Sequence, residues 1–278
     1  MTLKSTINST LHRLFFPGLK VPPKASWQEE LKSYGQIEEL SISRNSKKIA
    51  AILLRPQTEK IRGTVIFAHP ISRKAKYFFS DGLRIKNYLN ASYRVVLFDF
   101  NGFGESDRID LYFWKDIATV IHYVREKFPN EPLILHGLSF GSFNCIRATK
   151  ELPTNSKVIL ENNSRSMYDY WKRWPHKALV IKILEVKLWA PSFMRDMNMI
   201  QALKELNRPD LQFLFITCSD DKITPANEML ELADYLTAPK FFLHIENAKH
   251  LEGPIVAEQE YAQALNRFLE DTKKRVGV

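Results

Sequence analysis

The feature that most constrains this chain is a series of short apolar runs that alternate with helical patterns. Eight runs rich in Val, Ile, Leu and Phe cover residues 37–43, 49–55, 64–69, 93–100, 132–137, 156–162, 211–217 and 240–246. Amphipathic helical patterns lie between or after them, at residues 111–128, 226–236 and 257–274. Strands buried on both faces that alternate with helices indicate a mostly parallel sheet. The predicted fold class is therefore α/β, with about eight strands flanked by helices. The first two runs, joined by the turn-like residues 44–48, predict a hairpin.

Length and composition favour one large core. The chain has 278 residues, of which 45% are hydrophobic, enough apolar material for a single domain over residues 1–278. Residues 1–36 read as an N-terminal extension. Residues from about 163 to 208 show no strand pattern and carry three tryptophans. This segment exceeds an ordinary connection between a helix and a strand, so we expect a helical cap over the sheet edge; two crossover helices are the alternative.

Charge and cysteine content exclude several classes of function. The net charge is +9, but the basic residues are scattered, so we expect no nucleic-acid partner. The two cysteines do not form a Cys-x-x-Cys motif, which predicts no disulfide framework and no thiolate metal site. The N-terminus lacks a signal-peptide pattern and no apolar run reaches membrane-spanning length, so a cytoplasmic protein is expected. A weak amphipathic pattern over residues 7–15 could touch a membrane surface, although packing on the domain is favoured.

Residues 137–141 read Gly-Leu-Ser-Phe-Gly. Ser139 follows an apolar run directly, and a helical pattern begins at residue 142. A serine exposed on a strained turn between a strand and a helix needs very small residues two positions before and after it, and both positions are glycine. Ser139 is therefore the candidate nucleophile.

A serine hydroxyl needs a base that is held by an acid. Of the three downstream histidines, His176 lies in the expected cap and His244 lies inside a strand pattern. His250 lies in the loop after that strand, where α/β sites collect their residues, so it is the candidate base. Three carboxylates compete as the acid. Asp220 and Asp221 follow the 211–217 run, and Glu161 is the less favoured third.

Two backbone N–H groups are expected to form an oxyanion hole. One belongs to Phe140, the residue after the serine. The other comes from the loop after the 64–69 run; Pro70 has no N–H, so Ile71 is the candidate donor.

Together these stretches resemble the α/β-hydrolase superfamily, in particular its small serine esterases, lipase-like hydrolases and serine aminopeptidase-like members. The resemblance rests on residues 67–72 (oxyanion loop), 98–107 (the Asp-x-x-Gly-x-Gly-x-Ser turn), 136–142, and 218–225 with 247–250 (acid and base loops). It implies the family's fold, and it implies that Asp221, three residues before Thr224-Pro225, is the acid, while Asp99 is structural. The role of Asp220 stays open.

The resemblance implies a serine hydrolase of a small-molecule ester or thioester, with Ser139, Asp221 and His250 as the catalytic triad. Neither a metal nor an organic cofactor is expected. The apolar cap segment favours a hydrophobic or bulky acyl group. Aminopeptidase and acyltransferase activity with the same triad are alternatives, and a non-catalytic binding protein is a further one. Sequence alone leaves the substrate and the oligomeric state open.

Overall fold

The computed structural model describes residues 31–72, 74–166, 169–170, 173 and 198–270. In this part of the chain, eight strands form one sheet in the order β1-β2-β4-β3-β5-β6-β7-β8. The strands are β1 Gln36–Arg44, β2 Lys47–Arg55, β3 Gly63–Ala68, β4 Tyr93–Phe98, β5 Leu133–Leu138, β6 Lys157–Glu161, β7 Gln212–Cys218 and β8 Lys240–Ile245. The predicted number of strands and the α/β class are confirmed.

The first two strands form the predicted hairpin. β1 pairs with β2 and β2 pairs with β4 in antiparallel register, while every other neighbouring pair is parallel. Asn45 and Ser46 at the turn have φ of 52° and 59°. Two successive residues with positive φ give a turn whose twist matches that of the flanking strands, and this fixes the pairing register.

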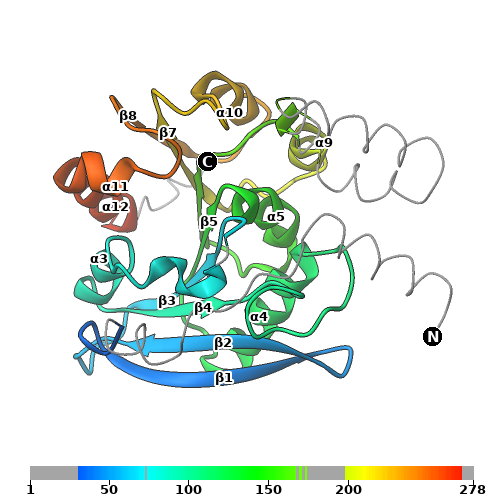
Figure 1. The fold of residues 1–278 in the computed structure, drawn as a ribbon, viewed down its shortest axis with the longest axis vertical. Helices are drawn as coiled ribbons and strands as arrows, with labels where there is room; N and C mark the ends of the chain where they lie inside the picture. The colour runs from blue at the N-terminus through cyan, green and yellow to red at the C-terminus, as the bar shows by residue number, and fades with distance from the viewer. Residues whose placement is uncertain (1–30, 73, 167–168, 171–172, 174–197, 271–278) are drawn as a thin grey trace, which may run out of the picture.

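Helices cover both faces of the sheet (Figure 1). The helices on one face are α4 Trp114–Lys127, α5 Phe140–Ala148, α9 Met199–Lys204 and α10 Ala226–Ala233; those on the other are α3 Ile85–Asn90 and α12 Glu258–Glu270. Alternate residues of β4 show the division, because Val96 and Phe98 enter the core under α4 and α5 whereas Val95 and Leu97 enter the core under α3 and α12. The central strands β3 to β7 are therefore buried on both faces, as their uninterrupted apolar sequences predict, whereas the edge strands β1 and β8 are exposed at alternate positions.

Several short elements were not anticipated. The 3₁₀ helices η1 Ala75–Phe79 and η2 Thr149–Glu151 and the short helices α3 and α11 Gly253–Val256 have few residues each, so they offer too little periodicity for a pattern to appear. Helix α5 begins two residues earlier than its pattern suggests, directly after Ser139. Within the expected cap, the structure describes α9 and an isolated bridge between Ser166 and Asn198. Residues 174–197 and the N-terminal extension up to residue 30 lie outside the described residues, so the cap and the extension stay predictions.

Six parallel strands end at the same edge of the sheet, and each is followed by a loop that carries polar residues. These loops follow β3, β4, β5, β6, β7 and β8. The carboxyl ends of parallel strands form the crevice where α/β proteins place their sites. This edge brings together segments that lie far apart in the sequence.

Candidate active site

Ser139 occupies a strained turn between β5 and α5. Its φ of 50° and ψ of −113° fall in a region that residues with a Cβ rarely adopt. Its N–H donates to the carbonyl oxygen of Glu161 at 2.8 Å, which ties the turn to the end of β6. The residue is 9% exposed, and its side chain borders a pocket.

The two glycines that flank Ser139 are required by close backbone contacts. A Cβ on Gly137 would lie 2.7 Å from the Cα of Ser142, and one on Gly141 would lie 1.9 Å from the carbonyl oxygen of Ala68. Helix α5 therefore begins directly against the end of β3. This contact is with rigid backbone, which cannot move aside as a flexible side chain can.

We expect Gly141→Ala to destabilise the fold and lower the activity together. Displacing the end of β3 or the start of α5 should cost about 3 kcal/mol, at the upper end of the usual cost of overpacking. That loss corresponds to a melting temperature about 6–10 °C lower, measurable by calorimetry. Ser43→Ala, at an exposed position of β1, is the control and should melt with the wild type. A Gly141→Ala protein of unchanged melting temperature would contradict the contact.

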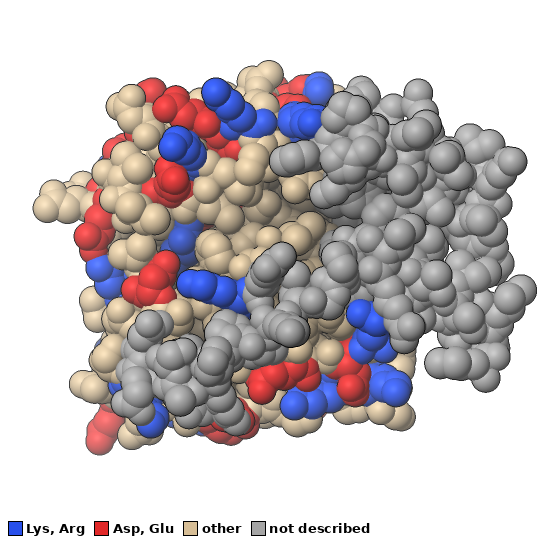
Figure 2. Space-filling view, viewed as in Figure 1, with Lys and Arg blue, Asp and Glu red and all other residues tan. Residues whose placement is uncertain are grey.

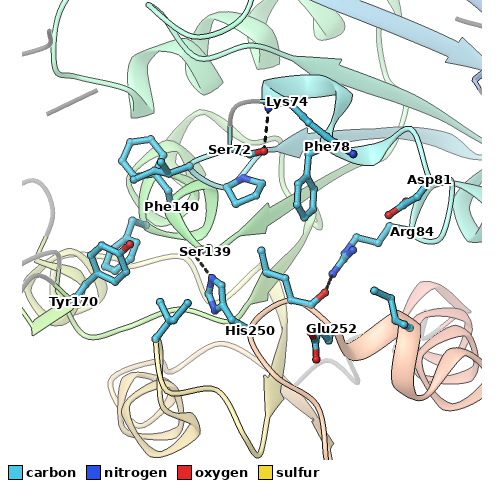
Figure 3. A pocket seen from close by; sticks show the side chains of 16 residues that line it. Ser72, Lys74, Phe78, Asp81, Arg84, Ser139, Phe140, Tyr170, His250 and Glu252 are labelled. Carbon is cyan, nitrogen blue, oxygen red and sulfur yellow. Dashed lines mark hydrogen bonds between the residues drawn. The ribbon is translucent and has the colours of Figure 1, made fainter. Parts of the chain in front are cut away.

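His250 lies in the loop after β8, within reach of both Ser139 and Asp221. Its Nε2 is 3.0 Å from Ser139 Oγ, and its Nδ1 is 2.7 Å from Asp221 Oδ2 (Figure 3). A carboxylate only accepts, so the proton of a neutral imidazole lies on Nδ1 and Nε2 is left to accept from the serine hydroxyl.

Asp221 is buried in a shell of hydrogen-bond donors. Oδ1 accepts the N–H groups of Ile223 and Thr224, both at 2.8 Å. Oδ2 accepts from the Thr224 hydroxyl and from Asn162 Nδ2 as well as facing His250. Burial by itself raises the pKa of Asp221, but His250 and the Thr224 donors outweigh it and hold that pKa below its usual value. The carboxylate is thus ionised at neutral pH.

The loop after β3 is ordered by His69. Its Nε2 accepts the N–H of Phe100 at 3.1 Å, so its proton lies on Nδ1, which donates to the carbonyl oxygen of Pro70 at 2.7 Å. Burial lowers the pKa of His69 to about 4, so the ring is neutral. In a trans peptide the C=O and the following N–H point in opposite directions. His69 therefore turns the Ile71 N–H away from the buried ring, and no acceptor for it is found among the residues with described positions.

Known proteins show the same arrangement of strands and helices. The family profile described as alpha/beta hydrolase fold matches residues 63–182. The structure of the esterase Pf2001 from Pyrococcus furiosus superposes with a TM-score of 0.66 at 18% identity, covering 90% of this chain and 97% of that one. An α/β serine hydrolase without a lid, XC6422 from Xanthomonas campestris, has a TM-score of 0.59 at 16% identity, covering 91% and 99%.

This chain has the α/β-hydrolase fold. The fold that the four motifs imply is thereby confirmed. Among curated proteins, the proline iminopeptidase PfmaB from Pestalotiopsis fici is 34% identical over 113 residues. That match spans 39% of this chain and 38% of the iminopeptidase, so it covers well under half of the relative's length.

The other candidates from the sequence lie elsewhere in the hydrolase fold. Asp220 is exposed, and its backbone N–H donates to the carbonyl oxygen of Ala248. Glu161 is buried but turned toward Arg84 rather than His250. His244 lies on the edge strand beside Thr217, and His176 is outside the described residues. The turn at Asp99 binds buried Lys76 and the N–H of Glu105, consistent with the structural role that the resemblance implies.

Two residues at the end of β6 support the site; Glu161 was weighed as a candidate acid and not for this role, and Asn162 was missed. The carbonyl oxygen of Glu161 holds the N–H of Ser139, and its carboxylate accepts from Arg84 Nε at 3.1 Å and Nη2 at 2.5 Å. Arg84 Nη2 also donates to the carbonyl oxygen of Leu251, next to His250, at 2.8 Å. Burial by itself raises the pKa of Glu161, but Arg84 and His136 outweigh it and lower that pKa to about 2.

Asn162 binds Asp221 directly, at 2.8 Å. The available signal was the polar pair Glu-Asn immediately after a buried strand.

We expect variants of Asn162 to change the pH dependence of turnover. Asn162 has φ of 48°, which glycine adopts without strain. Asn162→Gly removes one donor from Asp221 and should lower kcat about tenfold, with only a small upward shift of the acid limb of the pH profile. Asn162→Asp places a second carboxylate beside Asp221, which raises the pKa of the pair. Activity of that variant should therefore be lost at a pH about one unit higher than in the wild type. Coincident acid limbs for the wild type and Asn162→Asp would show that Asn162 does not act on Asp221.

A pocket of about 520 Å³ opens beside Ser139 and His250. Its lining includes Pro70, Ile71, Phe140, Phe143, Tyr170 and Ile223, together with charged residues considered below. On the described part of the face seen in Figure 2, Lys and Arg are interspersed with Asp and Glu. A mixed surface of this kind creates no field of one sign on that face.

Two features are absent from the described residues. None of the helices there is long and apolar enough to cross a membrane. In the same residues, no group of three or more His, Cys, Asp or Glu side chains is arranged to hold a metal ion.

Proposed function

We propose that this protein is a serine hydrolase that cleaves a carboxylic ester or thioester through an acyl-enzyme intermediate. The observation that carries the proposal is the hydrogen-bonded series Ser139–His250–Asp221, with distances of 3.0 Å and 2.7 Å. A serine with a base within hydrogen-bond reach, and an acid that orients the base, is the recurring arrangement of nucleophilic acyl transfer.

In the first half-reaction, Ser139 Oγ attacks the acyl carbon while its proton moves to His250 Nε2. Asp221 orients the imidazole and stabilises its charged form, which requires an ionised carboxylate; the lowered pKa of Asp221 supports this role. The carbonyl oxygen becomes an oxyanion that accepts from the N–H groups of Phe140 and Ile71. The tetrahedral intermediate then collapses, and His250 returns the proton to the leaving alcohol or thiol.

In the second half-reaction, a water molecule gives a proton to His250 Nε2 and its oxygen attacks the acyl carbon. Collapse of the second tetrahedral intermediate releases the carboxylic acid, and His250 returns the proton to Ser139 Oγ. The aromatic lining of the pocket supports a hydrophobic acyl group.

A fluorophosphonate probe tests the proposal, because it reacts with an activated serine and not with ordinary serine hydroxyls. The wild type should be labelled, and it should release p-nitrophenol from p-nitrophenyl butyrate in a burst that equals the enzyme concentration when deacylation is slow. A panel of p-nitrophenyl esters of rising chain length then measures the acyl preference. Absence of labelling on folded wild-type protein would contradict the proposal.

Peptidase activity is a second candidate, favoured by the partial similarity to a proline iminopeptidase. Comparing kcat/KM for proline p-nitroanilide and p-nitrophenyl butyrate separates the two activities. An added alcohol that captures the acyl group in preference to water would instead indicate an acyltransferase.

A further inference from the structure

The pocket beside Ser139 has two chemically different ends. Figure 3 shows Tyr170 and Phe140 on one side of Ser139 and His250, and charged residues on the other side. The first end is completed by Phe143 and Ile223. The second end is lined by Lys74, Phe78, Asp81, Arg84 and Glu252. A substrate that fills the pocket therefore meets apolar groups on one side of the reacting serine and polar groups on the other.

Arg84 is the most constrained residue of the polar end. It is 2% exposed, and its Nε and Nη2 are bound to Glu161 and to the carbonyl oxygen of Leu251. The rings of Phe78 and Tyr261 lie 5.9 Å and 6.0 Å from its guanidinium carbon. These contacts fix the guanidinium in place before any ligand arrives.

Nη1 of Arg84 is the guanidinium nitrogen left over. Nη1 makes no hydrogen bond to a described residue. It is also not fully enclosed by protein atoms. Because Arg84 lines the pocket, Nη1 is open to it. Glu161 already neutralises the guanidinium charge, so Nη1 offers a substrate a fixed hydrogen-bond donor rather than a net positive charge.

The remaining charges at this end are of both signs. Lys74 supplies an ammonium group without an acceptor among the described residues. Asp81 and Glu252 supply carboxylates that each use only one oxygen on a neighbouring backbone N–H. Arg84 is already paired with Glu161, so the groups that remain are one ammonium and two carboxylates. An ionic ligand at this wall faces a like charge as well as an opposite one, whereas a hydroxyl group pairs with either kind, since each hydroxyl both donates and accepts.

We propose that the substrate is an ester between an apolar acyl group and an uncharged, polyhydroxylated alcohol, with one alcohol hydroxyl accepting from Arg84 Nη1. The acyl chain lies among Phe140, Phe143 and Tyr170, and the alcohol lies between Lys74 and Asp81. This inference rests on the proposed hydrolase function and names its substrate class.

Four butyrate esters that differ only in the alcohol test the inference. Glyceryl butyrate is compared with propyl butyrate, which lacks the two hydroxyls, with cationic butyrylcholine and with anionic O-butyryl-lactate. The wild type should prefer the glyceryl ester to the propyl ester about tenfold in kcat/KM, the effect of about one net hydrogen bond. Both charged esters should be poorer substrates than the glyceryl ester.

Three variants locate the preference. Arg84→Lys keeps a cation for Glu161 but removes Nη1, and the glyceryl-to-propyl ratio should fall to about one. Lys74→Met, at an exposed position, should lower the ratio to about three. Lys86→Met on α3, which pairs with Glu258 outside the pocket, is the control and should keep the wild-type ratio. The ratio compares two substrates of the same variant. An effect of Arg84 on His250 that slows both reactions equally therefore leaves the ratio unchanged.

Three results would overturn the inference: a wild-type ratio near one, a preference for either charged ester, or a ratio that stays near ten in both pocket variants. Failure of the hydrolase proposal is distinguishable from these. In that case propyl butyrate is not hydrolysed and the fluorophosphonate does not label the folded protein, whereas a failed subsite leaves propyl butyrate hydrolysis and labelling intact.

Discussion

Ser139→Ala is expected to abolish fluorophosphonate labelling and to lower kcat by about 10⁴-fold or more. The substitution removes the only oxygen at the turn that lies within hydrogen-bond reach of His250 Nε2. Nucleophile substitutions in serine hydrolases leave only the residual rate from substrate binding and the oxyanion hole. Hydrolysis of p-nitrophenyl butyrate and gel fluorescence of the labelled protein measure the two effects.

The same variant should fold normally. The Ser139 hydroxyl makes one hydrogen bond among the described residues, to His250, and alanine tolerates the backbone conformation of this turn no worse than serine does. The melting temperature should therefore stay within about 2 °C of the wild type. Labelling that persists in folded Ser139→Ala protein would assign the reactive serine elsewhere.

Asp221→Asn is expected to lower kcat by about 10⁴-fold. The amide nitrogen that replaces one oxygen cannot accept the proton on His250 Nδ1. The imidazole is then held with its proton on Nε2, where it cannot take the serine proton. Five donors also face the two oxygens of Asp221. An amide offers one oxygen, so at least two of these donors lose their acceptor, and unfolding should require about 2 kcal/mol less.

Asp220→Asn is the matched control, one residue away. Asp220 is exposed, and its carboxylate accepts a hydrogen bond only from its neighbour Ser219 among the described residues. Turnover should stay within about twofold of the wild type, and stability should change by less than about 0.5 kcal/mol. Equal losses in the two variants would mean that the acid is not Asp221 alone.

The alternation of buried strands with helices could be predicted from the sequence because it depends on local periodicity. The hairpin at residues 36–55 was readable for the same reason, since the polar turn between two apolar runs leaves no other pairing as near. Short elements such as α3 and η1 could not be predicted, because one or two turns of helix are too short to show a hydrophobic period. The cap between residues 163 and 208 stays a prediction over most of its length.

The candidate site also contains some residues that the sequence predicted and others that it did not. Ser139, Asp221 and His250 were candidates because each follows the end of a predicted strand, and the sheet brings those ends to one edge. Arg84 and Asn162 were not assigned to the site, and Glu161 was weighed only as the acid. The bonds from Asn162 to Asp221 and from Arg84 to Leu251, beside His250, join residues 59 and 167 positions apart, and no local pattern records such a distance.

The sequence by itself determined the class of fold and the order of the candidate catalytic residues, because hydrophobic period and turn chemistry act between near neighbours along the chain. Tertiary structure decided which donors surround Asp221, where the proton of His69 lies, and that one nitrogen of Arg84 is open to the pocket. These properties depend on burial and on contacts between distant segments. They exist only when the strand ends are packed together, and the same packing gives the pocket its apolar and polar sides.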